Sequence, residues 1–172
     1  MEVMEFFQQC AGKWFSQRTS HALPPQEMEV GKSDLWIDIL PTDDRSAIEL
    51  CAACQIDPAS VLCGVQTRWE GTVGTNPKPE KGSVLIVAIA DAASARTGKI
   101  IRRSSPTEPP MMGSYTLNTD ESLTMITESD GLRAEERLWF VTPNLRERTS
   151  TIFHTSGQSY ASFCSEIRMG GQ

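Results

Sequence analysis

Residues 146–150 (Arg-Glu-Arg-Thr-Ser) place two arginines and a serine at alternate positions. Because successive side chains of a β-strand point to opposite faces, Arg146, Arg148 and Ser150 share one face if this run is a strand. A guanidinium presents paired N–H donors that match the two oxygens of a carboxylate, so this face could bind an acidic ligand. The alternative is a solvated outer face on which the arginines pair with neighbouring acids such as Glu147.

A third arginine, Arg18, lies in the early segment 12–21 (Gly-Lys-Trp-Phe-Ser-Gln-Arg-Thr-Ser-His). In a closed sheet the first strand lies beside the last strands, so we expect Arg18 to approach Arg146 and Arg148. Burying three guanidiniums around one cavity is costly unless an anion compensates their charge. We expect the carboxylates of a ligand to supply that anion.

Glu136 and Trp69 are the remaining candidates for a ligand site. On a strand, Glu136 shares its face with Leu138 and Phe140, so an inward Glu136 would be a carboxylate in largely apolar surroundings. The alternative is an exposed charge cluster formed by residues 135–137 (Glu-Glu-Arg). The indole of Trp69 could stack on a conjugated ligand, or it could pack in an ordinary core.

The Cys51-Ala-Ala-Cys54 motif suggests redox or metal chemistry, but its surroundings support neither. A redox motif of this kind follows a strand in a βαβ unit, and a zinc site needs a second pair of ligands, for which only His21 and His154 are present. We therefore expect no metal site and two cysteines packed on a helix face. Five cysteines are an odd number and a poor disulfide framework, which fits a reducing compartment.

Composition indicates a globular protein with one domain over residues 1–172. Hydrophobic residues make up 39% and charged residues 22%, which is enough to bury a core. The net charge of −6, without a cluster of Lys or Arg, argues against nucleic acid or an anionic membrane surface as a partner. The sequence lacks the apolar run of a signal peptide or membrane span, so we expect a non-exported, cytoplasmic protein.

Regularly spaced turn residues, among them Pro24-Pro25 and Asp130-Gly131, predict an up-and-down β protein that closes into a ligand-holding barrel. Residues 2–10 and 43–55 are expected to be helices, the first as a lid or plug and the second with Ala47, Leu50, Cys51 and Cys54 on one face. The loops 75–82 and 104–110 are rich in proline and could rim an opening. We predict ten strands, at 12–21, 28–40, 64–73, 83–90, 97–104, 113–118, 122–128, 132–141, 145–155 and 158–168.

The run 83–90 (Ser-Val-Leu-Ile-Val-Ala-Ile-Ala) is apolar on both faces of its predicted strand. Such a strand needs a cover on its outer face. Either the helix at 43–55 supplies this cover or a second subunit does, in which case the protein is a homodimer.

Several of these segments combine into one pattern over nearly the whole chain: Gly12-x-Trp14-x-Ser16-x-Arg18-Thr19-x-His21, Arg68-Trp69-Glu70-Gly71, Glu136-Arg-Leu-Trp139-Phe140, Pro143-Asn-Leu-Arg146-x-Arg148-Thr-Ser150 and Tyr160-Ala-Ser162. This pattern resembles the S-type phycobiliprotein lyases, the CpcS/CpeS family, which attach linear tetrapyrroles to the antenna proteins of cyanobacteria and related algae. The run 143–150 is its most discriminating part.

The resemblance implies a lipocalin-like ten-stranded barrel with no permanently bound cofactor and with phycocyanobilin as its substrate, held without covalent attachment. It implies apo-phycobiliprotein subunits, of the phycocyanin β and allophycocyanin types, as partners that receive the bilin on a cysteine through a thioether. It also implies a location in the cyanobacterial cytoplasm near phycobilisomes. By matched motif positions, the bilin pocket of similar proteins corresponds here to Arg18, Trp69, Glu136, Arg146, Arg148 and Ser150.

Within that pocket, Arg18 and Glu136 are the expected catalytic residues. A carboxylate beside a protonated bilin would stabilise the cation, whose ethylidene carbon is a better electrophile for a thiolate. A second hypothesis is a lipocalin or fatty-acid-binding-like carrier without transfer activity, because an arginine pocket for one carboxylate serves it equally well. The two hypotheses differ in whether a second protein receives the ligand.

Overall fold

The computed structural model describes residues 1–23 and 27–170. The turn expected at Pro24-Pro25 lies outside the described residues. The helices are α1 (Val3–Cys10), α2 (Arg45–Ala53) and the short 3-10 helix η1 (Pro58–Ser60). The strands are β1 (Gly12–Leu23), β2 (Glu27–Leu40), β3 (Val61–Val73), β4 (Glu80–Asp91), β5 (Ser94–Arg103), β6 (Met111–Leu117), β7 (Leu123–Ser129), β8 (Leu132–Thr142), β9 (Leu145–His154) and β10 (Ser159–Met169).

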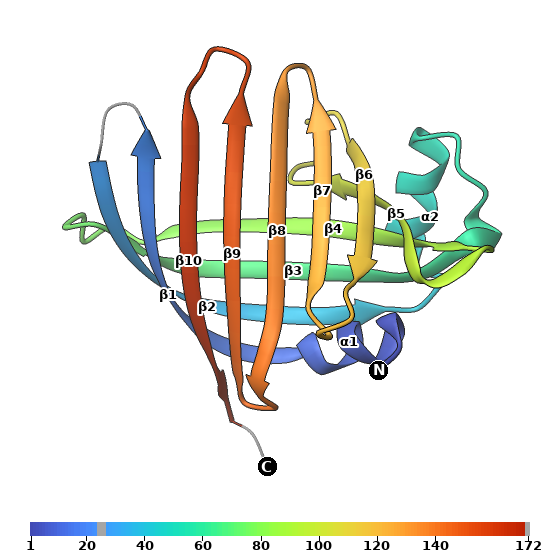
Figure 1. Cartoon of the computed structure of the whole chain (residues 1–172), viewed down its shortest axis with the longest axis horizontal. Helices are drawn as coiled ribbons and strands as arrows, with labels where there is room; N and C mark the ends of the chain where they lie inside the picture. Colours follow the sequence, from blue (N-terminus) through green and yellow to red (C-terminus); the bar gives the residue numbers. More distant parts are fainter. Residues whose placement is uncertain (24–26, 171–172) are drawn as a thin grey trace.

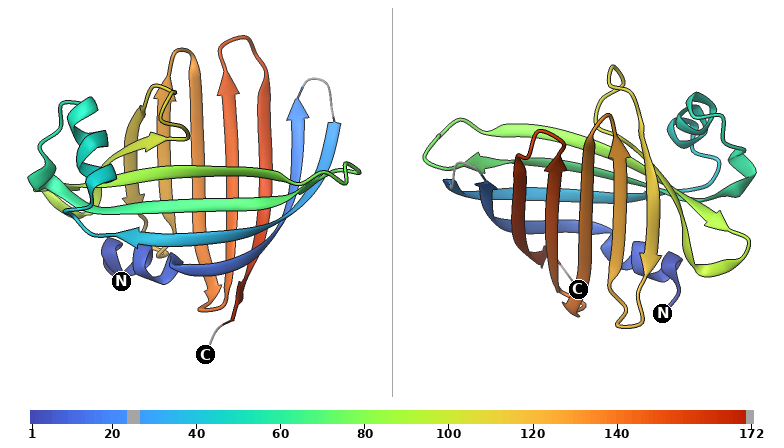
Figure 2. Two further views of the ribbon diagram at one scale, coloured as in Figure 1. Left: turned by 180° about the vertical axis from the view of Figure 1, so that it is seen from behind. Right: turned by 45° about the horizontal axis from the view of Figure 1, so that its top comes forward.

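The ten strands form one closed antiparallel barrel, as the turn spacing predicted. Each strand pairs with the next along the chain, and β1 closes the ring by pairing with β10, where Arg18 lies opposite Cys164. In Figure 1 the strands β6 to β10 run across the strands β2 to β5, while β1 curves upward alongside β10, so the barrel is flattened into two facing layers (Figures 1 and 2). The interior between these layers is where a ligand could be held.

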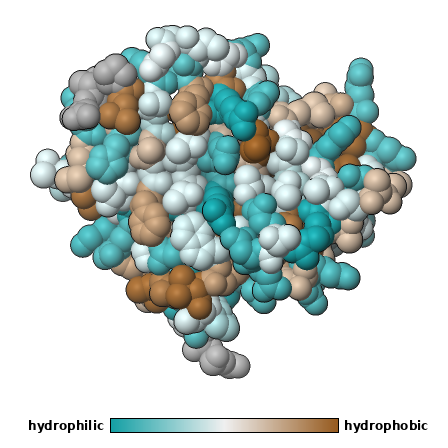
Figure 3. Space-filling model, in the orientation of Figure 1, coloured by the Kyte–Doolittle hydropathy of each residue, from teal (hydrophilic) through white to brown (hydrophobic). Residues whose placement is uncertain are grey.

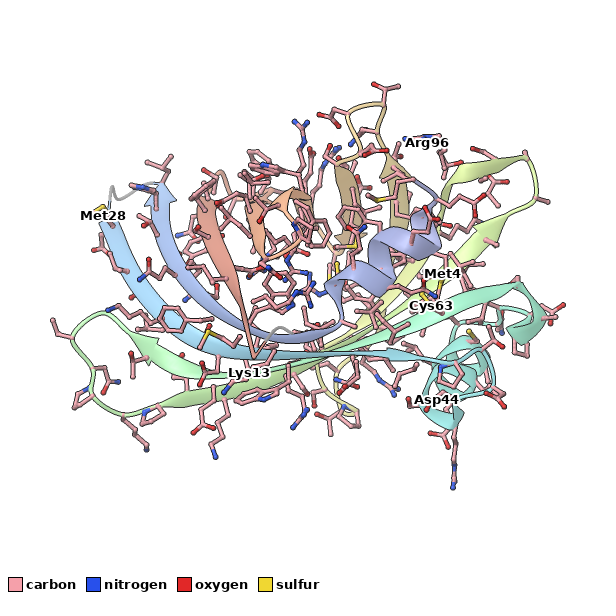
Figure 4. All side chains as sticks on the ribbon, turned by 90° about the horizontal axis from the view of Figure 1, so that it is seen from below. Met4, Lys13, Met28, Asp44, Cys63 and Arg96 are labelled. Atoms are coloured by element: carbon pink, nitrogen blue, oxygen red, sulfur yellow. The ribbon has the colours of Figure 1, made fainter. Side chains whose placement is uncertain are left out.

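Helix α1 closes one end of the barrel, which confirms the predicted plug. Glu2 and Glu5 form a capping box at its start, and its apolar face buries Phe6, Phe7 and Cys10 in the barrel interior. The indole Nε1 of Trp14 donates a hydrogen bond of 2.9 Å to the carbonyl oxygen of Cys10 and so fixes the end of the helix to β1. Figure 4 views this end from below and shows α1 crossing the opening between the two layers.

Helix α2 packs on the outside of the barrel. Asp44 caps its start by accepting hydrogen bonds from the backbone N–H groups of Ser46 and Ala47. Its apolar face, with Leu50 and Cys51 fully buried, covers the outer side chains of β4, among them Val87. The helix, and not a second subunit, therefore covers the strand that is apolar on both faces.

Two loops test the predicted element boundaries. The hairpin between β7 and β8 turns at Asp130 (φ 43°) and Gly131 (φ 79°), the left-handed pair that the Asp-Gly dipeptide predicted. The predicted loop 75–82 is shorter than expected, because residues 80–82 pair with residues 69–71 of β3. Proline lacks a backbone N–H, so it is excluded only from strand positions whose N–H must donate a hydrogen bond to the neighbouring strand. The charged residues after Pro79 can therefore still join the sheet.

No helix in the described part of the chain is long and apolar enough to span a membrane.

Candidate functional site

The barrel encloses a cavity of about 290 Å³ that begins at α1 and runs along the strand interior. Phe6 and Phe7 form its closed end. At the other end it is lined by Lys32 and Glu80, whose exposed side chains mark where the cavity meets solvent. Its wall combines apolar side chains with a set of charged ones, which is the composition of a site for an amphipathic ligand.

Arg146 and Arg148 of β9 share one face, as strand alternation predicted, and this face points inward and lines the cavity. Arg146 is only 3% exposed, and its Nε donates a hydrogen bond of 2.7 Å to Oε2 of Glu166. Arg148 donates from Nε and Nη2 to Oε1 of the same carboxylate, at 3.2 and 3.0 Å. The expectation that a ligand supplies the compensating anion was therefore incomplete, because the protein's own Glu166 compensates both arginines.

Glu166 is a component of the site that the sequence analysis missed. It is fully buried on β10, opposite Arg146 on one side and Ser16 on the other. Burial alone would favour the neutral acid, but Arg148 and Arg146 hold the pKa of this carboxyl below its ordinary value of 4.5. The sequence signal that could have identified Glu166 is its position two residues after Cys164, because residues two apart on a strand share one face.

Glu136 of β8 also points into the cavity, so it is not part of an exposed charge cluster. Its Oε1 accepts a hydrogen bond of 3.1 Å from Nη1 of Arg148. Its Oε2 lies 3.9 Å from Nη1 of Arg102, a cavity residue on β5 that the sequence analysis did not single out. Glu136 therefore lies between two guanidiniums from opposite layers of the barrel.

The other predicted site residues occupy different positions relative to the cavity. Arg18 lines it, and within the described residues its side chain forms no ion pair or hydrogen bond. Trp69 lines it as well, with its ring packed so closely over Gly82 that a Cβ there would lie 2.1 Å from Cζ2. Ser150 shares the inward face of β9 but is not among the cavity-lining residues, because it lies two positions beyond Arg148 along the strand.

The charged side chains of the interior do not balance. The cavity wall carries Arg18, Arg102, Arg146 and Arg148 against Glu136, and the buried Glu166 adds a second negative charge. At the rim, Lys32 and Glu80 cancel. Four arginines against two glutamates leave an excess of two positive charges, which favours a ligand with two carboxylates.

The cysteines are unsuited to act as nucleophiles in this structure. Cys51 and Cys54 pack on the apolar face of α2 as predicted, and Cys10, Cys63 and Cys164 are buried in the barrel. Burial raises the pKa of all five thiols, and that of Cys63 to about 12, so they remain protonated near neutral pH. Among residues 1–23 and 27–170, no three His, Cys, Asp or Glu side chains are grouped to hold a metal ion.

Comparison with known proteins agrees with this architecture. The solved structure of the S-type phycobiliprotein lyase CPES from Guillardia theta superimposes with a TM-score of 0.87 at 31% identity, covering 100% of this chain and 95% of that one. A structure of unknown function from Nostoc punctiforme, of the DUF3598 family, shares only the fold, with a TM-score of 0.52 at 12% identity, over 95% of this chain and 49% of that one.

Curated relatives are similar over nearly their whole length. Chromophore lyase CpcS/CpeS of Thermosynechococcus vestitus is 45% identical over 99% of this chain and 94% of its own. Phycocyanobilin lyase subunit CpcS of Picosynechococcus is 35% identical over 98% of this chain and 86% of its own. The family model described as CpeS-like protein matches residues 2–169. With its barrel, its arginine-lined cavity and these relatives, the chain belongs to the CpeS-like family.

Proposed function

We propose that this protein is a chromophore lyase that binds phycocyanobilin in the barrel cavity and attaches it to a cysteine of a phycobiliprotein subunit, of the phycocyanin β or allophycocyanin type. The lyase class is supported by relatives that carry this name at up to 45% identity. The observation that carries the proposal is the excess of two positive charges among the cavity arginines. A linear tetrapyrrole bears two propionates, so its charge complements that of the cavity wall.

The cavity residues have different parts in bilin binding. Arg146 is paired with Glu166, so it stabilises the shape of the cavity wall. Toward the bilin it contributes a positive electrostatic potential more than direct contact. Within the described residues Arg18 forms no ion pair and Arg102 approaches only Glu136, at 3.9 Å, so these two arginines are the ones available to receive propionates. Trp69, held against Gly82, presents its ring to the conjugated system of the bilin. Ser150 would contact only the part of the ligand that extends past Arg148.

Glu136 and Arg18 are the proposed catalytic residues. The carboxylate of Glu136 stabilises the protonated bilin through its pyrrole N–H groups, which makes the ethylidene carbon more electrophilic. The partner's thiolate then forms the carbon–sulfur bond at this carbon, and the electron pair of the ethylidene double bond moves into the protonated tetrapyrrole and neutralises it. Arg18, by binding a propionate, holds the bilin so that the reactive carbon faces the partner.

The attacking thiol comes from the partner protein in this proposal. The five thiols of this chain have raised pKa values, so none competes for the ethylidene carbon. The bilin therefore stays noncovalently bound until an apo-phycobiliprotein docks where the cavity meets solvent. A cytoplasmic location near phycobilisomes would bring the two proteins together.

The test is to mix the purified protein with phycocyanobilin, record the visible absorbance, and add an apo-phycobiliprotein β-subunit. A red-shifted complex whose colour moves onto the partner, seen as bilin fluorescence on an acid-denaturing gel, supports the lyase. The matched control is the same subunit with its acceptor cysteine changed to serine. A complex that transfers bilin to neither phycocyanin nor allophycocyanin subunits would indicate a carrier, and no spectral change would contradict a bilin site. Phycoerythrobilin in parallel tests the choice of bilin.

A further inference from the structure

The barrel wall has an unpaired strand edge beside Trp69. Strand β4 begins at Glu80, but its pairing with β5 begins only at Leu85, which lies opposite Arg103. Within the described structure, residues 80–84 therefore pair with β3 alone, and their other edge is unpaired. The left view of Figure 2 shows the outer side of β2 to β4, where β5 ends beside the middle of β4.

A groove of about 670 Å³, which we call the outer groove, lies outside the barrel at this unpaired edge. Outward side chains of β2, β3 and β4 form its floor, and the loop that follows β5 forms one side. The groove faces away from the viewer in Figure 3, which shows the outer side of β6 to β10. The floor includes Trp36, Arg68 and Lys81, and the loop contributes Ser104, Ser105 and Pro106.

The outer groove combines an aromatic surface with hydrogen-bond donors. The guanidinium of Arg68 lies 5.7 Å from the ring centroid of Trp36, and it forms no ion pair with any described residue. Lys81 differs, because its ammonium lies 3.8 Å from Oε1 of Glu70. The hydroxyl of Ser104, an exposed loop residue, forms no hydrogen bond within the described part of the chain. Arg68 and Ser104 are therefore available to donate hydrogen bonds to a carbonyl oxygen of a ligand.

Trp69 separates the outer groove from the barrel cavity, because it lines both. Its ring lies over Gly82, where the missing side chain leaves room for the indole at the unpaired edge of β4. Glu80, at the solvent end of the cavity, is followed in sequence by Lys81 of the groove. A flat ligand stacked on the indole can therefore extend from the cavity into the groove.

The barrel cavity is small for a linear tetrapyrrole. Its volume of about 290 Å³ lies below the range of about 300–1,000 Å³ that is usual for pockets of drug-sized ligands. A tetrapyrrole has four rings and two propionates and is a large ligand of this kind, so the cavity does not hold all of it. The outer groove supplies the additional space.

The end of β5 connects the two spaces. Arg102 lines the cavity and, in the proposed function, receives a propionate. Ser104 follows two residues later and lines the outer groove, so it lies about 7 Å further along an extended chain. The propionates of a tetrapyrrole are carried by its two central rings. A central ring held at Arg102 therefore brings the adjoining terminal ring within reach of Ser104 and Trp69.

We propose that the bilin occupies both spaces, with its reactive terminal ring in the outer groove. This site rests on the proposed function and adds to it the position of the ethylidene carbon. The cavity holds the central rings and their propionates, and Trp69 stacks where the ligand leaves the barrel. The carbonyl oxygen of the terminal ring accepts hydrogen bonds from Arg68 and Ser104. The ethylidene carbon is then exposed outside the barrel, so the partner's thiolate reaches it without entering the cavity.

The first test changes the outer groove and leaves the cavity intact. Ser104→Glu removes a donor and places a carboxylate beside the carbonyl oxygen of the terminal ring. In an absorbance titration of the full chain, phycocyanobilin should bind this variant at least about fivefold more weakly than the wild type. The matched control is Thr107→Glu, which adds the same charge to an exposed position of the same loop outside the groove, and it should bind as the wild type does.

Arg68→Glu is the second variant. Arg68 is exposed on the floor of the groove, so its change should weaken bilin binding in the same direction as Ser104→Glu. Neither Arg68 nor Ser104 lines the barrel cavity, so weaker binding reports the groove and not the interior. Circular dichroism shows whether each variant keeps its β-sheet signal, and Arg68→Glu decides the test if Ser104→Glu does not fold.

The second test locates the reactive carbon with 2-mercaptoethanol and needs no partner protein. The sulfur of this thiol bonds to the ethylidene carbon and its proton ends on the tetrapyrrole, which shortens the conjugated system and moves the absorbance to shorter wavelength. With each protein saturated with bilin, the wild-type complex should react. Ser104→Glu should react more slowly than Thr107→Glu, because its carboxylate repels the thiolate beside the reactive carbon.

The outcomes separate the outer groove from the proposed function. If the wild type binds bilin and Ser104→Glu binds it equally well, the groove holds no part of the ligand and the inference is wrong, while the proposed function stands. Equal rates of thiol addition to the wild-type and Ser104→Glu complexes would also overturn it. A wild-type chain that binds no bilin would refute the proposed function and the inference together.

Discussion

Glu166 and Arg146 form a buried ion pair directly across β9 and β10, and their side chains are 0% and 4% exposed. Arg148, two residues along β9, binds the other oxygen of the same carboxylate. Removing one member of a buried pair leaves an uncompensated charge in a medium of low dielectric constant. The shape of the arginine wall therefore depends on a residue that does not itself line the cavity.

The first prediction concerns the stability supplied by Glu166. Glu166→Ala leaves Arg146 without a partner, and the free energy of unfolding should fall by about 3–5 kcal/mol. Glu166→Gln keeps the size of the side chain and one oxygen acceptor, so its loss should be smaller. Urea unfolding followed by circular dichroism gives the free energy. The control, Glu49→Ala, removes an exposed ion pair with Arg45. An equal loss of stability in Glu49→Ala and Glu166→Ala would show that the buried pair of Glu166 stabilises the fold no more than an exposed pair does.

The second prediction concerns the pH dependence of stability. The pKa of Glu166 lies near 4.5 in the unfolded chain and lower in the folded protein, because Arg148 and Arg146 outweigh the effect of burial. Between these two values unfolding takes up a proton, so stability is present above pH 4.5 and is lost as the pH falls through the folded pKa.

Urea unfolding at several pH values between about 3 and 6 measures this dependence, and Glu166→Gln should flatten it. Asp44 and Asp120 also have lowered pKa values, but the wild-type chain and Glu166→Gln both retain these residues. The difference between the stability profiles of the two proteins therefore isolates Glu166. Two parallel profiles would contradict the assignment.

The third prediction separates bilin binding from stability. The side chain of Arg18 lines the cavity without an ion pair in the described structure, so Arg18→Gln should weaken phycocyanobilin binding by about 1–3 kcal/mol. The free energy of unfolding should change by less than about 0.5 kcal/mol. Arg146→Ala should instead lower both quantities, because it also breaks the pair with Glu166. Absorbance titration measures bilin binding, and urea unfolding measures stability. Unchanged bilin binding by Arg18→Gln would show that Arg18 is not part of the bilin site.

The fourth prediction concerns the position of Trp69. Because a Cβ at residue 82 would lie 2.1 Å from its ring, Gly82→Ala must displace the indole. We expect weaker bilin binding and an altered absorbance maximum of the bound bilin, since the stacking ring has moved. Ser83→Ala, the next residue and on the opposite face of β4, is the control. Unchanged spectra for Gly82→Ala would show that the bilin does not contact Trp69.

Local patterns in the sequence were sufficient for most of the fold. Alternation placed Arg146 and Arg148 on one strand face and Glu136 on the face of Leu138. The Asp130-Gly131 dipeptide predicted a turn with two positive φ angles, and the apolar face of α2 was assigned correctly. These features depend on residues that are neighbours along the chain, so periodicity and turn chemistry specify them.

The tertiary structure decided what those residues meet. Glu166 lies 20 positions from Arg146 in sequence, and only the register of β9 on β10 brings them together. Likewise, only the closed barrel places Arg102 of β5 across from Glu136 of β8, and only the packing of α2 determines which face of β4 is covered. Strand pairing and closure join distant segments through backbone hydrogen bonds that carry no residue code, so the sequence determined the inward-facing arginines, while the fold determined their partners.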